Sequence, residues 1–405
     1  MSSSVDPAAL AGTPAIQRER QAAWQQLGDS HLPDSQDEQW RKTGLTPMVA
    51  ALGERWWQPC GTQGVESSHY IDGALRIGSD GSVIDPLPTG ITVTPLRQLL
   101  ERGGADSPIT HSADDYTSCL NSSWVEDGLS LHLAENTTIE QPLQIVDHHG
   151  TGATYRLSHI HLGVGAQLTV VEALTSSTTG VDCIRMECHL QAEATLNHYR
   201  LQQHGSRHFH LGSVVVNLDR SASYNLHAVE LGGSISRLDL ITNLNQAGAS
   251  CDIHGLMVLN GRQHTDHHIT INHTAPHCHS RINYRTILND RAHAVFNGRV
   301  VVAKGASGTD SAQHSGNILL SKRAQIDTTP ELEIYNDDVK CAHGATIGQL
   351  DSEHLFYLQS RGLSEDEARK LLIHAFAESV LMGITTPHLR QQIEQSVTTK
   401  LNSGD

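Results

Sequence analysis

A weak internal repeat in the middle of the chain is the feature that most constrains its fold. Ala166, Ala194, Ala222 and Ala249 follow one another at intervals of 28, 28 and 27 residues, each just before a strand-like run. Each coil of a solenoid stacks on the previous coil, so a small residue recurs at one corner of every coil. The spacing therefore predicts stacked β-coils. A chance recurrence in an Ala- and Ser-rich β-sandwich is the alternative.

Short β-rich segments separated by Gly, Asn and Asp fill the chain from about residue 125 to about residue 350. Aromatic residues make up only 4% of the chain, so we expect the interior to be a ladder of Val, Ile, Leu and Ala side chains. The clearest strand candidates are Leu129–Leu133, Tyr155–Leu162, Gln167–Glu172, Thr195–Leu201 and His208–Asn217.

Helical patterns precede this β core, which we place at residues 123–346. Residues 1–122 are predicted to be mostly helical, and Ile16–Leu27 carries Ala and Leu at helical spacing. Trp24 and Trp40 can supply apolar anchors. The other elements expected in this part are a short strand at Ala74–Ile77 and helices at Pro95–Arg102 and Ala113–Leu120.

A helical pattern returns in residues 347–405. A first helix is expected over Ser352–Ser360. Ser364 and Glu367 then form a capping-box pattern, and apolar residues recur at amphipathic spacing from Ala368 to Val380. Pro387 is expected to begin a last helix in its first turn.

The charge balance excludes several classes of partner. The chain has 28 Lys and Arg against 44 Asp and Glu, and a formal charge of −16 disfavours nucleic acid and anionic membranes. The N-terminus lacks the basic and apolar regions of a signal peptide, and no run approaches the ~18 apolar residues that cross a bilayer. We expect a cytoplasmic protein.

The seven cysteines fit that expectation, because they are odd in number, scattered and without a C-x-x-C pair. Cys183 and Cys188 are five positions apart, so in a strand they face opposite sides and do not form a joint metal site. The cysteines are Cys60, Cys119, Cys183, Cys188, Cys251, Cys278 and Cys341.

The densest group of histidines lies between residues 264 and 279. Histidine is the commonest metal ligand, so this density suggests a zinc or iron site. A metal site needs three or four converging side chains, whereas neighbours such as His267 and His268 diverge in a strand. We therefore interpret the group as surface and ladder histidines. Its members are His264, His267, His268, His273, His277 and His279, with Asp266 and Cys278 among them.

Cys341 and His343 form a more promising pair. They lie in a strand-like run, Asp337–Ala345, and an i, i+2 pair in a strand shares one face. A thiolate and an imidazole together can bind a soft or borderline metal, pass a sulfur, or lower the pKa of the thiol. A core cysteine beside an incidental histidine is the alternative.

Other chemistries lack their motifs. The sequence has no Walker A pattern, no complete G-x-G-x-x-G and no G-x-S-x-G. We therefore expect a protein that is not itself an ATPase or a hydrolase.

The segment from Asp290 to Ile384 resembles the SufB/SufD family of iron–sulfur assembly proteins. Its Lys-Cys-x-His-Gly-Ala-Thr run resembles the SufD branch more than the SufB branch. The segments that carry the resemblance are Phe296–Val300, Gln313–Ser321, Pro330–Tyr335, Asp337–Thr346 and Phe356–Gly362.

This resemblance implies a right-handed parallel β-helix between helical ends, in a scaffold subunit that is not an enzyme. It implies pairing with a SufB-like paralogue and binding of a SufC-like ATPase through the C-terminal helices. His343, and less securely Cys341, would support a transient iron–sulfur cluster shared with the paralogue, with no cofactor held tightly by the isolated chain. The helix positions next to the ATPase contact are Leu371, Leu372, Ala375 and Phe376, although packing on the chain's own β-helix is an equal alternative for each.

Two other classes of function stay open at this point. A β-helix enzyme acting on polysaccharide would need an exposed carboxylate or basic cluster along one solenoid face. A self-contained His-rich metalloprotein would hold a stoichiometric metal ion as a monomer. The solenoid ends also leave open a homodimer of the chain alone.

Overall fold

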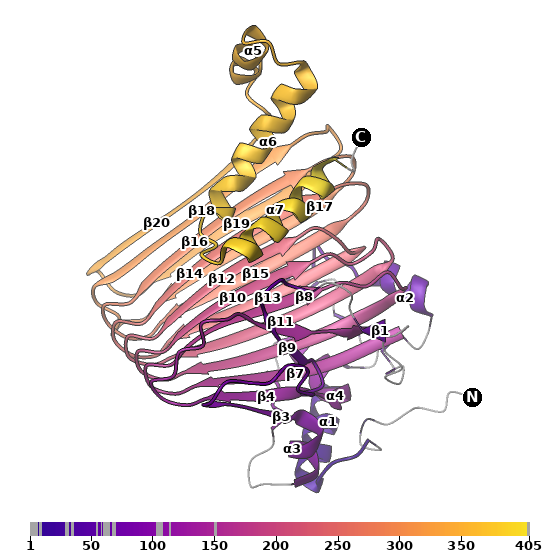
Figure 1. The fold of residues 1–405 in the computed structure, drawn as a ribbon, viewed down its shortest axis with the longest axis vertical. Coiled ribbons are helices and arrows are strands. Elements are labelled where there is room, and N and C mark those ends of the chain that lie inside the picture. The colour runs from indigo at the N-terminus through magenta and orange to yellow at the C-terminus, as the bar shows by residue number, and fades with distance from the viewer. Residues whose placement is uncertain are drawn as a thin grey trace.

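Two nine-stranded β-sheets form the walls of a parallel β-solenoid (Figure 1). The computed structural model describes Pro7 and residues 10–28, 32–33, 36–53, 56–57, 59, 65–66, 70–102, 108–112, 115–149 and 152–402. Within each sheet the chain advances by one strand per coil, so neighbouring strands are parallel and in register. The mainly β fold predicted from the sequence is confirmed.

The two sheets alternate along the chain. Sheet I contains, in spatial order, β19 (Gln325–Ile334), β17 (His293–Val302), β15 (His264–His273), β13 (Ile235–Leu244), β11 (His208–Leu218), β9 (Gly180–Leu190), β7 (Gly152–Leu162), β4 (Asp127–Leu133) and β3 (Ile91–Pro95). Sheet II contains β2 (Leu75–Gly78), β5 (Leu143–Val146), β8 (Gln167–Leu174), β10 (Thr195–Gln202), β12 (Ser223–Glu230), β14 (Ser250–Leu259), β16 (His279–Leu288), β18 (Thr309–Leu319) and β20 (Val339–Gly348). Two pairs are antiparallel, β3 with β4 and the small pair β1 (Val65–Glu66) with β6 (His148–His149).

The alanine repeat marks one corner of the solenoid, as predicted. Ala166, Ala194, Ala222 and Ala249 are fully buried, and the same corner continues at Cys278 and Thr309. The residue before each of them has a positive φ, and the series is Gly165, Glu193, Ser221, Gly248, His277 and Gly308. This left-handed conformation turns the chain sharply, and it is unusual for the three members that are not glycine.

Backbone hydrogen bonds tie these corners together along the solenoid. The Glu193 N–H donates to the Arg220 carbonyl at 2.9 Å, and the Ser221 N–H donates to the Ala247 carbonyl at 3.1 Å. The side chain that follows each corner residue is small and is buried in the interior of the solenoid. The repeat is thus a direct consequence of coil stacking.

Helices cover the outer faces of both sheets. The first four, α1 (Pro14–Gln26), α2 (Thr46–Leu52), α3 (Leu96–Arg102) and α4 (Tyr116–Trp124), pack on sheet I. Trp24 and Trp40 anchor this layer: the ring of Trp24 lies 5.0 Å from that of Trp57, and the Arg237 guanidinium lies 3.9 Å from the centre of the Trp40 ring. Helix α4 begins at Tyr116, three residues later than expected.

The C-terminal helices follow the predicted pattern. They are α5 (Ser352–Ser360), α6 (Glu365–Leu381) and α7 (Pro387–Asn402), and the Ser364–Glu367 capping box is present. Helices α6 and α7 pack on the outer face of sheet II, while α5 projects beyond the last coil (Figure 1). No helix in the described part of the chain is both long enough and apolar enough to span a bilayer.

Substitution of a corner alanine should destabilise the solenoid. Ala222→Leu adds three carbon atoms to a fully buried corner and should lower the free energy of unfolding by about 1–3 kcal/mol. Urea or thermal unfolding measures the change. Ala192→Leu, in the same type of turn but at a half-buried position, is the matched control, and an equal loss in both variants would contradict the role of the corner.

Candidate functional site

The predicted pair Cys341 and His343 lies on β20, the terminal strand of sheet II. Their register partners on β18 are Ser311 and Gln313, both buried. Cys341 packs against the interior core, and His343, two positions on, points to the same side. The pair therefore faces the interior at the open end of the solenoid, with Cys341 half-buried and His343 exposed.

The interior changes character as it approaches this end. One ladder of inward side chains passes through Leu226, Ile253 and Ile282 and then continues as Gln313 and His343. The Gln313 amide donates to the Glu331 carbonyl of sheet I at 3.0 Å. Apolar rungs thus give way to polar rungs, which places hydrogen-bonding and metal-binding groups at the rim.

The thiol of Cys341 is not activated within the chain. Its partial burial raises its pKa, and a nearby carboxylate, Asp310, acts in the same direction. The suggested lowering of this pKa by His343 is therefore not observed. Deprotonation of Cys341 would need a bound metal ion or a partner that supplies positive charge.

The predicted docking positions on α6 divide into two kinds. Leu371 and Ala375 are exposed, with Leu371 49% exposed, whereas Leu372 and Phe376 are half-buried. Phe376 packs under the Arg285 guanidinium, 5.4 Å from the ring centre. The buried residues of α6 are Ala368, Ile373, Ala377, Val380 and Leu381, so the buried stripe only partly coincides with the predicted one.

The histidines between 264 and 279 do not converge. His267 points inward and hydrogen-bonds the Tyr284 hydroxyl at 3.0 Å, whereas His268 points outward to Asp266 at 3.0 Å. His264 lies with His293 on the outer face, and His277 occupies a corner. The interpretation as ladder and surface histidines is confirmed for these residues, all of which the structure describes.

The remaining cysteine predictions can be placed as well. Cys183 packs with the N-terminal helices and Cys188 with the interior core, so they face opposite sides as expected. Cys183, Cys188, Cys251, Cys278 and Cys341 are free thiols. Cys60 lies outside the described residues.

A set of buried charged groups inside the solenoid was not predicted. Arg200 contacts Glu172 at 3.2 Å and Glu230 at 3.4 Å. Burial alone would raise the pKa of Glu172, but a hydrogen bond from His198 and the charge of Arg200 lower it below its ordinary value. Paired in this way, the carboxylates remain charged in the interior.

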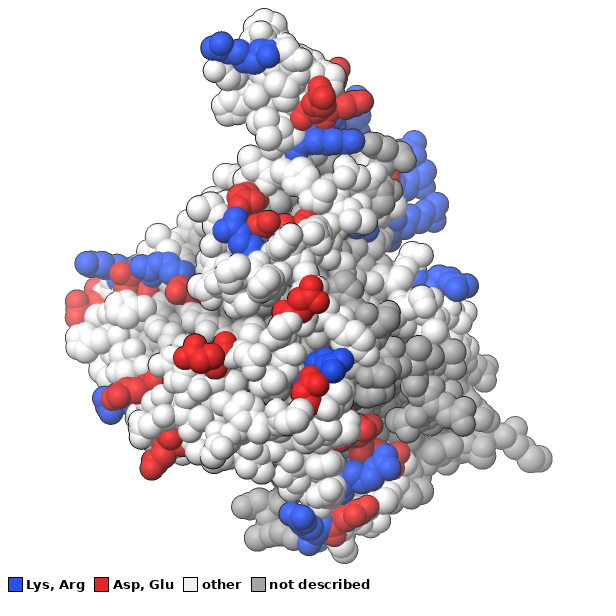
Figure 2. Space-filling view, in the orientation of Figure 1, with Lys and Arg blue, Asp and Glu red and all other residues white. Residues whose placement is uncertain are grey.

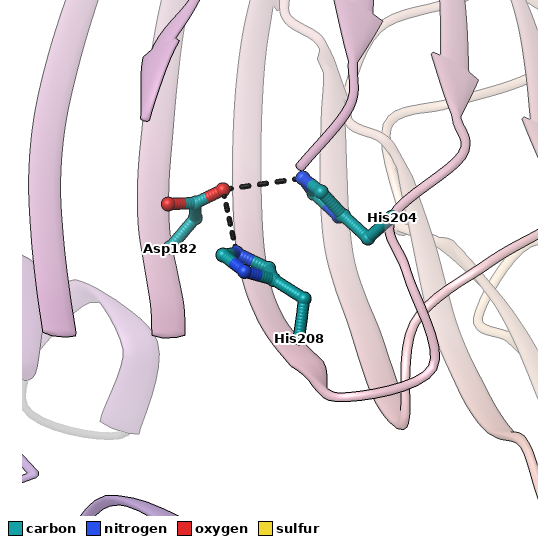
Figure 3. A group of neighbouring side chains, drawn as sticks. All are labelled: Asp182, His204 and His208. Atoms are coloured by element: carbon teal, nitrogen blue, oxygen red, sulfur yellow. Dashed lines mark ion pairs between the residues drawn. The ribbon is translucent and has the colours of Figure 1, made fainter. Parts of the chain in front are cut away.

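A second buried group lies beside this network. Asp182 on β9 contacts His204 and His208, which flank the turn between β10 and β11, and all three are buried (Figure 3). The two histidines are four residues apart in the sequence, a spacing that could have drawn attention to them. Asp182 is more than twenty residues away, and only coil stacking brings it to them.

Charges on the surface are dispersed. On the face shown in Figure 2, acidic and basic side chains lie singly or in mixed pairs over a mostly uncharged solenoid surface. Mixed pairs of this kind among the described residues include Arg220–Glu193 and Arg281–Asp310, both at 2.9 Å. This face has no continuous basic stripe of the kind that binds nucleic acid.

The protein is thus a parallel β-solenoid with helices at both ends, and Cys341 and His343 lie together on its last strand. Residues 145–376 match the family model described as SUF system FeS cluster assembly, SufBD core domain. The match covers more than half of the chain, which therefore belongs to the SufB/SufD family of iron–sulfur cluster assembly proteins.

Within this family the chain is SufD-like. It is 35% identical to the iron–sulfur cluster assembly protein SufD of Escherichia coli, over 62% of this chain and 60% of that protein. A SufBD family protein of Synechocystis is 30% identical over 94% of this chain and 90% of its own length. A SufBD family protein of Mycobacterium tuberculosis is 25% identical over 91% of this chain and 89% of its own length.

Buried neutral histidines should make the fold sensitive to acid. Burial, with a smaller effect of His254, lowers the pKa of His227 from 6.5 to about 3. Below pH 6.5 the unfolded chain therefore binds a proton at this position that the folded chain does not bind until the pH nears 3. The stabilisation is complete above pH 6.5 and is lost progressively as the pH falls toward 3.

The variant His227→Phe should retain the stacking with Tyr199 and His254, but its unfolded state has no imidazole at this position to bind the proton. Between pH 6 and pH 4 the slope of the free energy of unfolding against pH should decrease by up to about 1.4 kcal/mol per pH unit, which corresponds to one proton. Denaturant titrations at several pH values measure the slope. His388→Gln, at an exposed position, is the control, and an unchanged slope in His227→Phe would refute the assignment.

Proposed function

We propose that this chain is a scaffold subunit of a SUF-type complex in the cytoplasm, where it supports assembly of iron–sulfur clusters without being an enzyme itself. It pairs with a SufB-like paralogue and binds a SufC-like ATPase. The observation that carries this proposal is the position of Cys341 and His343 at the open rim of a solenoid that belongs to the SufB/SufD family.

The last coil offers the surface for the paralogue. Among the described residues, neither β19 nor β20 has a strand on its outer side, and most side chains of both strands are half-buried or exposed. An uncovered strand edge is a ready template for pairing with another chain. A similar solenoid end would extend both sheets, and a second copy of this chain would take that place when the paralogue is absent.

The interface would complete a cluster site. A Cys–His pair supplies two ligands, whereas iron–sulfur clusters are usually held by four. The paralogue would supply the remaining ligands, with iron and sulfide as cargo. His343 is exposed at the rim, whereas partial burial raises the pKa of the Cys341 thiol and so favours its protonated form.

The projecting C-terminal helices offer the surface for the ATPase subunit. Every residue of α5 is at least partly exposed, including Phe356 at 72% and Tyr357 at 56%. Leu371 and Ala375 continue this apolar surface onto α6. Since Phe376 contacts Arg285 on β16, a displacement of α6 would act on sheet II two strands away from β20.

Co-purification tests the proposal as a whole. The tagged chain should be recovered from its native cells with an ATPase subunit and a SufB-like paralogue, and the complex should accumulate iron and acid-labile sulfide. Recovery of the chain without either subunit, and without cluster formation after mixing with them, would overturn the proposal.

Replacing the exposed rim histidine should impair cluster formation without impairing formation of the complex. His343→Ala should reduce the iron and sulfide content of the complex several-fold while leaving its subunit composition intact, because the side chain is exposed and no core contact is lost. His314→Ala, exposed on the adjacent strand but on its outer face, is the control. A normal cluster yield in His343→Ala would remove His343 from the site.

Charges placed on the exposed face of α6 should weaken ATPase binding. The double variant Leu371→Glu/Ala375→Glu leaves the buried stripe of α6 untouched and should reduce affinity for the ATPase subunit at least tenfold in a titration. Met382→Glu, 67% exposed at the end of the same helix, is the control. Equal affinity of the double variant and the control would place the docking surface elsewhere.

A further inference from the structure

Three potential metal ligands meet in the interior, far along the chain from Cys341 and His343. The Nε2 atoms of His204 and His208 lie 3.2 and 3.0 Å from the same carboxylate oxygen of Asp182. One ligand atom from each residue lies within 4.8 Å of the other two. Figure 3 shows both imidazoles directed at this oxygen from one turn, with Asp182 on β9, the strand next to β11.

These separations suit a metal ion. Two ligands that are each about 2.1 Å from an ion, at angles between about 90° and 110°, lie about 3.0–3.4 Å apart. The two measured nitrogen–oxygen distances fall in this range. Two imidazoles and one carboxylate are a donor set for first-row transition metals such as Zn²⁺ and Fe²⁺, and three ligands leave positions open for water or a second molecule.

The surrounding hydrogen bonds orient His208 for such a role. Its Nδ1 lies 3.3 Å from the Thr178 carbonyl, which can only accept, so Nδ1 carries the hydrogen. The Nε2 atom is then available to face the carboxylate and an ion. Metal-binding histidines usually make this kind of second contact with a carbonyl or carboxylate.

The backbone holds the turn rigidly between two neighbouring coils. The Gly205 N–H donates to the Ser176 carbonyl at 2.7 Å, and the Gly233 N–H donates to the His204 carbonyl at 2.7 Å. The His204 and His208 rings stack with their centres 4.4 Å apart. Asp182 is fixed by the register of β9 with β11, where it lies opposite His210. The ligand set is therefore preorganised.

An ion could reach the site from the surface. His204 lines a pocket of about 280 Å³, together with Ser206, Gly232, Asn260, Gln263 and Lys400. Lys400 of α7 stands at this pocket, where its ammonium donates to Asn260 at 2.7 Å and to Gln263 at 2.6 Å. The pocket thus lies between His204 and the last turns of α7.

A buried guanidinium also interacts with the carboxylate of this group. Burial lowers the pKa of Arg156, and the charge of Asp182 acts in the opposite direction. Arg156 is also paired with Asp147, so a cation bound by Asp182 would share that carboxylate with a guanidinium that already has a partner of its own.

We propose that Asp182, His204 and His208 bind a divalent first-row transition-metal ion inside the solenoid, separately from Cys341 and His343. The existence of the site is argued from geometry alone. The identification of Fe²⁺ as the ion bound in the cell rests on the proposed function. In that case the chain holds a ferrous ion in an oxygen- and nitrogen-lined position, apart from the rim where clusters form.

Anaerobic titration with Co²⁺ tests the site, because its visible absorption reports coordination geometry. The full chain with Cys341→Ser/His343→Ala is used, so that the rim contributes nothing. We expect one Co²⁺ per chain, and we expect Asp182→Asn and His204→Gln each to weaken binding at least tenfold. His189→Gln, which removes an exposed histidine paired with Asp219, is the control and should bind as the parent does.

X-ray absorption of the Zn²⁺- or Co²⁺-loaded parent chain keeps the test independent of how well the buried variants fold. A shell of nitrogen and oxygen atoms with two imidazoles supports the site. No binding by the parent, a different imidazole count, or undiminished binding in well-folded Asp182→Asn would overturn it and leave the three residues as a structural ion-pair cluster. A failed co-purification with unchanged Co²⁺ binding would count against the proposed function alone.

Discussion

The positive-φ corner at which each coil stacks on the next is the constraint on which the rest of the structure depends. From Gly165 to Gly308 the corner residue donates its N–H to the following coil, and a small side chain fills the space beside it. The three corner residues that are not glycine, Glu193, Ser221 and His277, accept this conformation because the neighbouring coils hold the backbone there. The identical corner keeps both sheets in register over the length of the solenoid.

Because neighbouring strands are in register, equivalent residues of successive coils form ladders, and these ladders determine which polar side chains meet. Residues one coil apart lie about 4.8 Å apart, so an inward polar side chain finds partners two or three dozen residues away in sequence. Glu172, Arg200 and Glu230 meet in this way, as do Asp182 and the His204–His208 turn. At the final coil the same ladders end without a further rung, which leaves Cys341 and His343 at an open rim.

The helices then decide which surfaces remain for partners. The tryptophan-rich N-terminal layer covers sheet I, and α6 and α7 cover sheet II. Among the described residues, exposed surfaces include the edge formed by β19 and β20, the projecting α5 and one side of α6. The two surfaces are joined through α6 and sheet II, because Phe376 of α6 contacts Arg285 of β16.

The sequence by itself determined the solenoid, the helical ends and the Cys341–His343 pair, because a repeat at one corner, a capping box and an i, i+2 spacing are local patterns. The sequence also predicted correctly that the histidines between 264 and 279 do not converge on one site, because the alternation of side chains along a strand is a local pattern as well. Only the tertiary structure decided which side of α6 is buried and that Asp182 meets His204 and His208. The physical reason is that coil-to-coil register and helix docking depend on the summed packing of distant residues, which no short segment encodes.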